Sequence, residues 1–303
     1  MGKVITIFRT FELKINENFS GKTIKAVLKS HYGLSEHMIT QLKKGDGITV
    51  DGKKEFVTRI LKEGELLKIT LFEEGSENIL PDDIPLDILY EDEDILAVNK
   101  PGDMPTHPSI YHYRGTLANA VMNYYSDVPF TFRAVTRLDR DTSGVVIIAK
   151  NAIACDKLSR QLQSGEFVKE YVAVCVGIPN PEKGRINAPI HREKEGIIKR
   201  CIDAKGKSAI SDYEVIAKSE DFSLVRLSPK TGRTHQLRLH LSHIGTPIFA
   251  DFLYGTDVEN ERIRLHCKKT SFSHPITGKK IEIIAPIPED MDLEKIKRHG
   301  LVK

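Results

Sequence analysis

Residues 137–144 read RLDRDTSG, and they run directly into the apolar segment VVIIAK at residues 145–150. The first stretch predicts a charged turn that ends at Gly144, and the second has the length and composition of a buried strand. A turn at the end of a rigid strand can hold the carboxylate of Asp139 in fixed geometry beside neighbouring guanidinium groups. An ordinary charged surface turn before a buried strand is the alternative interpretation.

A second long run, TGRTHQLRLHL at residues 231–241, follows the alternating segment FSLVRLSP at residues 222–229. This order predicts a strand, a glycine turn and then a helix, with Thr234 as a candidate N-cap and Arg233 presented just before the helix. A basic strip on an exposed helix is the alternative. That alternative does not explain why the second run follows the first at a distance of about 90 residues.

Both runs resemble the signature motifs of the RluA-type RNA pseudouridine synthases. The resemblance continues in the turn-rich PGDMPTHP at residues 101–108, in KEY at residues 169–171 and in LHC at residues 265–267, and it covers nearly the whole chain. One departure is Thr136, since the family commonly has His before the arginine. The resemblance implies an α+β fold, in which a long mixed, largely antiparallel sheet is flanked by helices. It also implies an isomerase that converts specific uridines in RNA to pseudouridine.

The resemblance assigns a role to each candidate site residue. Asp139 is the expected catalytic carboxylate, and the family's arginine that pairs with it matches Arg233. Tyr171 is expected to line the site and pack on the uracil. A target base must leave its stack to react, so Arg137 is expected to fill the vacated space, with Arg140 as a further RNA contact.

The chemistry explains why a carboxylate is needed. Breaking the N-glycosidic bond requires a carboxylate near the anomeric carbon, as nucleophile or as base on the sugar, and the sequence leaves both roles open. The reaction needs no redox change or phosphate energy, and the chain has no P-loop, dinucleotide fingerprint or metal-ligand spacing. We therefore expect no cofactor and no metal. The four cysteines have no C-x-x-C pairing, which favours free thiols in a reducing cytoplasm.

The excess positive charge of the chain lies near its N-terminus. Residues 20–70 contain ten Lys and Arg against six Asp and Glu, a net +4, so the remaining chain carries −1 of the total of +3. Apolar spacing predicts a helix capped by Ser20, a second helix capped by Ser35, and strands near residues 48–53 and 66–71. This helix–helix–β order with lysine-rich turns resembles the S4 RNA-binding fold. The lysines expected to contact RNA are Lys22, Lys25, Lys43, Lys44 and Lys53.

These patterns divide the chain into an S4-like domain at residues 1–75, an acidic linker at residues 76–86 and a catalytic domain at residues 87–303. In the catalytic domain we expect a hairpin from residues 87–90 and 95–100, a helix capped by Asn151, and a strand at residues 169–177.

RNA is the expected partner. Ribosomal RNA is favoured over transfer RNA, because S4-bearing members of the family mostly modify the large ribosomal subunit. A tRNA-directed synthase and a non-catalytic S4-type RNA-binding protein remain alternatives. A carboxylate glycosidase would need a second acid, and Asp141 is poorly placed for that role. No apolar stretch approaches the ~20 residues of a membrane span, and the N-terminus lacks the pattern of an export signal. The expectation is a cytoplasmic monomer that does not bind membranes.

Overall fold

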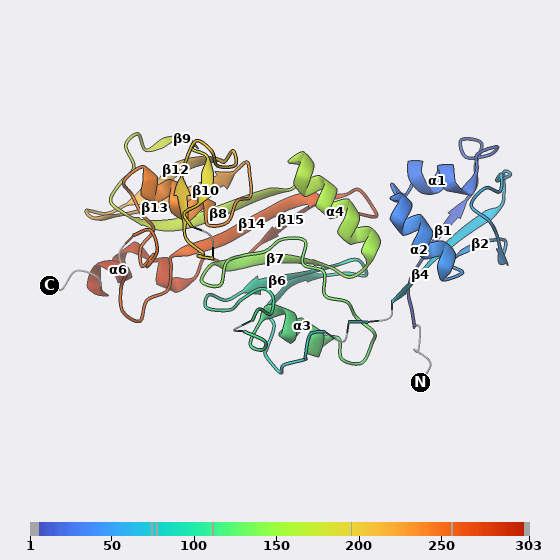
Figure 1. Cartoon of the computed structure of the whole chain (residues 1–303), viewed down its shortest axis with the longest axis horizontal. Coiled ribbons are helices and arrows are strands. Elements are labelled where there is room, and N and C mark those ends of the chain that lie inside the picture. The colour runs from blue at the N-terminus through green and yellow to red at the C-terminus, as the bar shows by residue number, and fades with distance from the viewer. Residues whose placement is uncertain are drawn as a thin grey trace.

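The computed structural model describes residues 6–73, 75–76, 78–110, 112–194, 196–255 and 257–299. A small N-terminal unit lies at one end of an elongated molecule, and a larger domain built on one long sheet forms the rest (Figure 1). Among the described residues, no helix combines the length and the apolar character needed to cross a membrane.

The N-terminal unit has two helices and a four-stranded antiparallel sheet of order β1-β4-β2-β3. The apolar faces of the helices share one core with the sheet, and this packing stabilises both helices. The two helices follow each other in the predicted order. Strand β1 was not predicted, and it pairs along its length with β4. The elements are β1 (Thr6–Lys14), α1 (Ile24–Ser30), α2 (Glu36–Lys44), β2 (Ile48–Val50), β3 (Lys53–Lys54) and β4 (Leu66–Glu73).

The two predicted helix caps have different outcomes. Ser35 caps α2 as expected, since its hydroxyl accepts a hydrogen bond from the Met38 amide at 3.3 Å. Ser20 does not cap α1, and the prediction was wrong by three residues. The backbone of Ser20 belongs to a preceding turn, in which its amide bonds to the Asn16 carbonyl. Thr23 caps α1 instead.

The larger domain is α+β with a long mixed sheet, as expected, and this sheet has nine strands. Its strand order is β5-β6-β7-β14-β8-β13-β12-β9, with β15 paired to β14, and every pairing is antiparallel except the short one between β7 and β14. The predicted hairpin forms, and Asn151 caps α4 through the Ala154 amide. The elements are β5 (Ile88–Glu91), β6 (Ile95–Lys100), α3 (Leu117–Tyr124), β7 (Ser143–Ala149), α4 (Ala152–Ser164), β8 (Val168–Val176), β9 (Lys183–Asn187), β10 (Ile190–Arg192), β11 (Arg200–Ile202), β12 (Ile210–Lys218), β13 (Phe222–Pro229), α5 (Gln236–His243), β14 (Leu265–Ser273), β15 (Lys280–Ile284), a 3₁₀ turn η1 (Glu289–Met291) and α6 (Leu293–His299).

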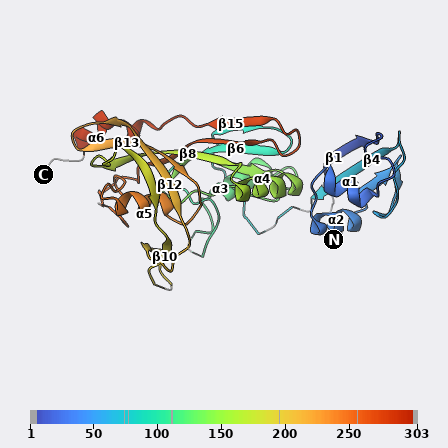
Figure 2. The ribbon, with the colours of Figure 1, turned by 90° about the horizontal axis from the view of Figure 1, so that it is seen from above.

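The two faces of the sheet are covered differently. Helices α3, α4 and α5 lie on one face, and α6 lies on the other (Figure 2). The alternation of side chains along β8 matches this division. Tyr171 and Ala173 belong to the core under α3, α4 and α5, whereas Val172 and Val174 pack with Ile296 of α6. Tyr171 therefore faces the side of the sheet that carries α5.

Candidate active site

Asp139 lies in the turn that leads into β7, near the centre of the sheet. Its carbonyl accepts a hydrogen bond from the Thr142 amide at 3.2 Å, and its side chain is half-buried. Residue Leu138 is fixed from the other side, because the Thr106 hydroxyl donates to its carbonyl at 2.9 Å. The turn that follows needs glycine at position 144. A Cβ there would lie 2.2 Å from the carbonyl oxygen of Cys267 on β14, and the φ of +112° is one that other residues rarely adopt.

A buried lysine joins the Asp139 turn to a neighbouring loop. Lys100 is fully buried, and its ammonium donates to the carbonyls of Pro101 and Met104 at 2.7 Å and of Arg140 at 3.0 Å. Burial lowers the pKa of Lys100 to about 7, while the nearby carboxylates of Asp141 and Asp139 act in the opposite direction. Sequence reasoning did not single out this residue.

Strand register brings Tyr171 to the same place. His266 on β14 pairs with Ser143 on β7 and with Val172 on β8, so Tyr171 lies one residue from the line that joins the three strands. Tyr171 is 6% exposed. Burial raises the pKa of its hydroxyl well above the usual value, and Cys267 and Asp139 add to the effect. The hydroxyl therefore stays protonated.

Arg238 on α5 is a second buried basic residue of this site, and the sequence interpretation overlooked it. It is 2% exposed, and its guanidinium donates two hydrogen bonds, of 2.8 and 2.7 Å, to the fully buried carboxylate of Asp251. Burial opposes its charge, yet Asp251 and the charge of Asp139 raise its pKa. The sequence signal that could have identified it is its place between two leucines, which predicts a buried position on the helix. A buried arginine requires a carboxylate partner.

The expected pair between Arg233 and Asp139 is not present among the described contacts. Arg233 is exposed, and its Nε donates to the carbonyl of Ser208 at 3.0 Å. The physical reason is that α5 starts one residue later than predicted. His235, rather than Thr234, is the N-cap residue, with a φ of +56° and no side-chain capping bond. Arg233 therefore lies before the helix and is exposed, whereas Arg238 lies within α5 and is buried.

The two arginines proposed for base flipping lie at the surface of the Asp139 turn. Arg137 is exposed, and its charge contributes to lowering the pKa of His107, after the larger effect of burial. Arg140 is held by Asp103, to which its Nε donates at 2.7 Å. Thr136, which stands where the family commonly has His, is buried and accepts a hydrogen bond from the Ile147 amide at 3.0 Å. It therefore fixes the start of the turn against β7.

Four of the five predicted N-terminal lysines are exposed and Lys25 is partly buried, and they differ in their contacts. Lys25 forms an ion pair with Glu36 at 3.0 Å, and Lys22 lies over the ring of Phe19. The remaining three have no ion pair with a described carboxylate: Lys43, Lys44 and Lys53. They are the free cations of the predicted set.

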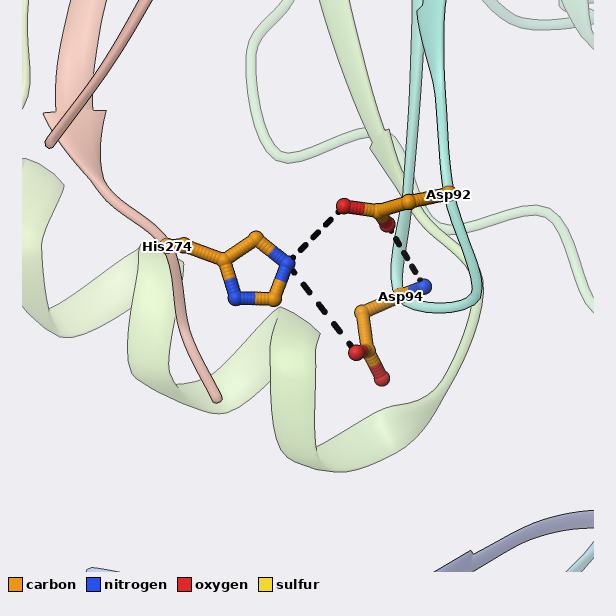
Figure 3. Close-up of side chains that lie close together, drawn as sticks. All are labelled: Asp92, Asp94 and His274. Carbon is orange, nitrogen blue, oxygen red and sulfur yellow. Dashed lines mark hydrogen bonds and ion pairs between the residues drawn. The ribbon is translucent and has the colours of Figure 1, made fainter. Parts of the chain in front are cut away.

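A separate cluster in the larger domain is formed by Asp92, Asp94 and His274 (Figure 3). The amides of Ile276 and Thr277 both donate to Nδ1 of His274, so the ring proton is on Nε2 and points to Asp92 at 3.0 Å. Such a nitrogen is a donor and not a metal ligand.

Asp94 of this cluster also contacts the N-terminal unit. Arg9 of β1 donates to both carboxylate oxygens of Asp94, at 3.3 and 3.2 Å. Ile153 of α4 is fully buried within the core of the N-terminal unit, and Ile276 packs beside it. The two units therefore share a built interface, with an ion pair at its edge and apolar contacts at its centre.

Known proteins share both the sequence and the fold of this chain. Residues 94–243 match the family described as RNA pseudouridylate synthase. The chain is 39% identical over 264 residues to YjbO of Bacillus subtilis, an uncharacterised RNA pseudouridine synthase, which covers 86% of this chain and 93% of the relative. It is 34% identical over 300 residues to ribosomal large subunit pseudouridine synthase D of Escherichia coli K12, with 91% and 90% covered.

A solved structure supports the same grouping. The human RNA pseudouridylate synthase domain containing 1 protein superposes with a TM-score of 0.59 at 26% identity, over 72% of this chain and 95% of that one. Residues 94–243, which match the family model, include the whole stretch from the Asp139 turn to α5. The chain therefore belongs to the RNA pseudouridine synthase family and is an isomerase that acts on RNA.

Proposed function

We propose that this chain is an RluA-type synthase that converts specific uridines of large-subunit ribosomal RNA to pseudouridine, with Asp139 as the catalytic carboxylate. The observation that carries the proposal is the electrostatic setting of Asp139. Its half-buried carboxylate acts on the buried guanidinium of Arg238 and on the buried hydroxyl of Tyr171, at the centre of the sheet.

The chemistry assigns a task to each of these groups. Asp139 acts on the ribose, as nucleophile at the anomeric carbon or as base on the sugar, and both tasks need the ionised form. Arg238 keeps its charge in the buried site because Asp251 holds it by two hydrogen bonds, and the charge of Asp139 also raises the pKa of Arg238. Tyr171 offers a neutral aromatic face to the uracil.

The target uridine has to leave its stack before it reaches Asp139. Arg137 is free at the surface of the turn to fill the space that the uridine leaves, and Arg140 and Arg233 lie exposed as further contacts to the RNA backbone. Packing of the extruded base on Tyr171 offsets part of the unstacking cost, since stacking on an aromatic ring is worth roughly 1–3 kcal/mol.

The N-terminal unit is proposed to be an S4-like RNA-binding module. Its helix–helix–β order, its net charge of +4 over residues 20–70 and its free lysines support this role. The unit would increase affinity and choose the region of RNA, while the Asp139 site performs the reaction.

Ribosomal RNA is the favoured substrate, because a relative that is similar over nine-tenths of this chain carries the name ribosomal large subunit pseudouridine synthase D. A tRNA-directed synthase would use the same site residues and is the second candidate. The cytoplasmic location and the monomeric state remain predictions from the sequence.

Mapping of pseudouridines in total RNA tests the proposal. Cells that lack the gene should lose one or more pseudouridines in large-subunit ribosomal RNA, and the wild-type gene should restore them while Asp139→Asn should not. Loss of pseudouridines from transfer RNA alone would instead identify transfer RNA as the substrate. An unchanged map would contradict the proposed activity.

A further inference from the structure

A basic hairpin projects from the larger domain beside α5 (Figure 2). It consists of β10, β11 and their flanks, residues 190–194 and 196–207, and strands β10 and β11 pair with each other rather than with the long sheet. Its base is fixed, because the amides of Ile190 and Lys207 each donate to the other's carbonyl at 2.9 Å. Its Lys and Arg residues form no ion pair with a described carboxylate: Arg192, Lys194, Lys199, Arg200, Lys205 and Lys207.

Between this hairpin and α5 lies a hollow of about 530 Å³, here named the hairpin groove. Lys199 and Arg200 of the hairpin form one side, and Glu193 is the acidic side chain among the described residues that line it. Leu239 and Tyr254 provide an apolar and aromatic surface opposite. The volume is within the range of small-molecule sites, and the pairing of free cations with an aromatic face suits a phosphate-linked base.

The groove is connected to the active site through Tyr254. The Arg200 amide donates to the Tyr254 hydroxyl at 2.8 Å, and the same hydroxyl forms a hydrogen bond with Nδ1 of His235 at 2.9 Å. The guanidinium of Arg238 lies 5.4 Å from the Tyr254 ring. Both His235 and Arg238 interact electrostatically with Asp139. The wall of the groove is therefore shared with the residues around the catalytic carboxylate.

We propose that the hairpin groove binds a nucleotide of the substrate RNA that flanks the target uridine. Lys199 and Arg200 hold its phosphate, and its base packs on Tyr254 and Leu239. The inference rests on the proposed function, and it names a second contact with the RNA that would contribute to the choice of uridine by the sequence or shape beside it.

The test compares two charge-matched double variants in the full-length protein. K199A/R200A removes two cations of the groove but keeps the Arg200 amide that bonds to Tyr254. K183A/R185A removes two exposed cations of β9, on the same domain, that pair with Glu214 and Asp212. Urea unfolding checks that both variants fold as the wild type does.

Binding is measured by fluorescence anisotropy with a labelled single-stranded oligouridylate across a potassium chloride series. K199A/R200A should weaken binding roughly ten-fold and reduce the slope of log K against log salt by about 1.4, or about 0.7 for each phosphate contact. K183A/R185A should change neither value. Equal effects of the two variants would overturn the proposal.

A second measurement locates the nucleotide directly. Photocrosslinking with a 4-thiouridine oligonucleotide should label a peptide that contains Tyr254 or Cys201, and K199A/R200A should abolish this crosslink. Labelling of the N-terminal unit alone would overturn the proposal. Pseudouridine mapping separates the proposed activity from the proposed binding site. Specific binding in the groove without isomerisation would refute the proposed activity. Isomerisation without binding in the groove would refute the proposed nucleotide site.

Discussion

At the residue scale, the site depends on which arginine is buried. Arg233 and Arg238 lie five residues apart, and only the second is enclosed by protein. A guanidinium at 2% exposure is held by the carboxylate of Asp251, so the two side chains form one unit on which the charge of Asp139 acts. An exposed arginine such as Arg233 is free to meet RNA but is screened by solvent.

The first prediction concerns Asp139. Asp139→Asn keeps the shape of the side chain and removes its charge and nucleophilic oxygen, so the single-turnover rate should fall by roughly a thousand-fold or more. RNA affinity and the free energy of unfolding should change little. The measurement is pseudouridine formation in a large-subunit rRNA transcript with enzyme in excess. A variant that keeps more than a tenth of the wild-type rate would refute the assignment.

The second prediction separates the two arginines. Arg238→Ala leaves Asp251 buried without its partner, and it should lower the free energy of unfolding by about 3–5 kcal/mol. Arg233→Ala, at an exposed position, should change it by less than about 0.5 kcal/mol. Urea denaturation of both variants gives the comparison. A double-mutant cycle with Asp251→Asn should show strong coupling for Arg238, and additive losses would mean that the pair does not stabilise the fold.

At the element scale, three strands converge at the site because of one parallel pairing. His266 of β14 lies opposite Ser143 of β7, and its Nδ1 is 2.9 Å from the Ser143 hydroxyl. This side chain is fully buried. The contact aligns the start of β7, and therefore the Asp139 turn, with β8 and Tyr171.

The third prediction is a pH dependence of stability due to His266. Burial lowers its pKa from 6.5 to about 4. In the unfolded chain His266 is protonated as the pH falls below about 6.5, whereas in the folded chain it is protonated only near pH 4. The free energy of unfolding therefore falls as the pH drops from 6.5 to 4. His266 should account for a decrease in the free energy of unfolding on the order of 2–3 kcal/mol over this pH range.

Urea denaturation at several pH values between 6.5 and 4 measures this decrease. His266→Gln removes the titrating group, so its stability should depend less on pH than that of the wild type over this window. Parallel curves for the two proteins would show that His266 does not contribute.

At the scale of the whole molecule, positive surfaces lie on two separate parts of the chain. One is the N-terminal unit with Lys43, Lys44 and Lys53, and the other is the basic hairpin of residues 190–207. The N-terminal unit is fixed on the larger domain through Arg9 and Ile153, so its lysines are held in place relative to the active site.

The fourth prediction tests the role of the N-terminal lysines. Replacing Lys43, Lys44 and Lys53 by Ala should reduce the slope of log K against log salt by roughly 2, and should raise KM more than it lowers kcat. Substitution is preferable to deletion of residues 1–78, because deletion would also expose Ile153 and leave Asp94 without Arg9. The control replaces three exposed lysines of the larger domain: Lys183, Lys218 and Lys280. An unchanged slope in the first variant would refute the S4-like interpretation.

The sequence by itself determined several of the elements and the reaction class of this protein. Apolar periodicity and turn residues are local signals, so the predicted hairpin and the helix capped by Asn151 both appear in the structure. The two long motifs predicted the family to which the chain belongs. Strand β1 was missed, because its stability depends on pairing with β4, which lies more than 50 residues later.

Only the tertiary structure decided which charged groups meet. The choice of Arg238 over Arg233 depends on where α5 begins and on the position of Asp251, and neither follows from local spacing. Burial of Lys100 beside Arg140 and the hydrogen bond between Arg200 and Tyr254 likewise depend on segments far apart in the chain. A charge is stabilised in a buried site by partners in space, and sequence motifs do not specify those partners.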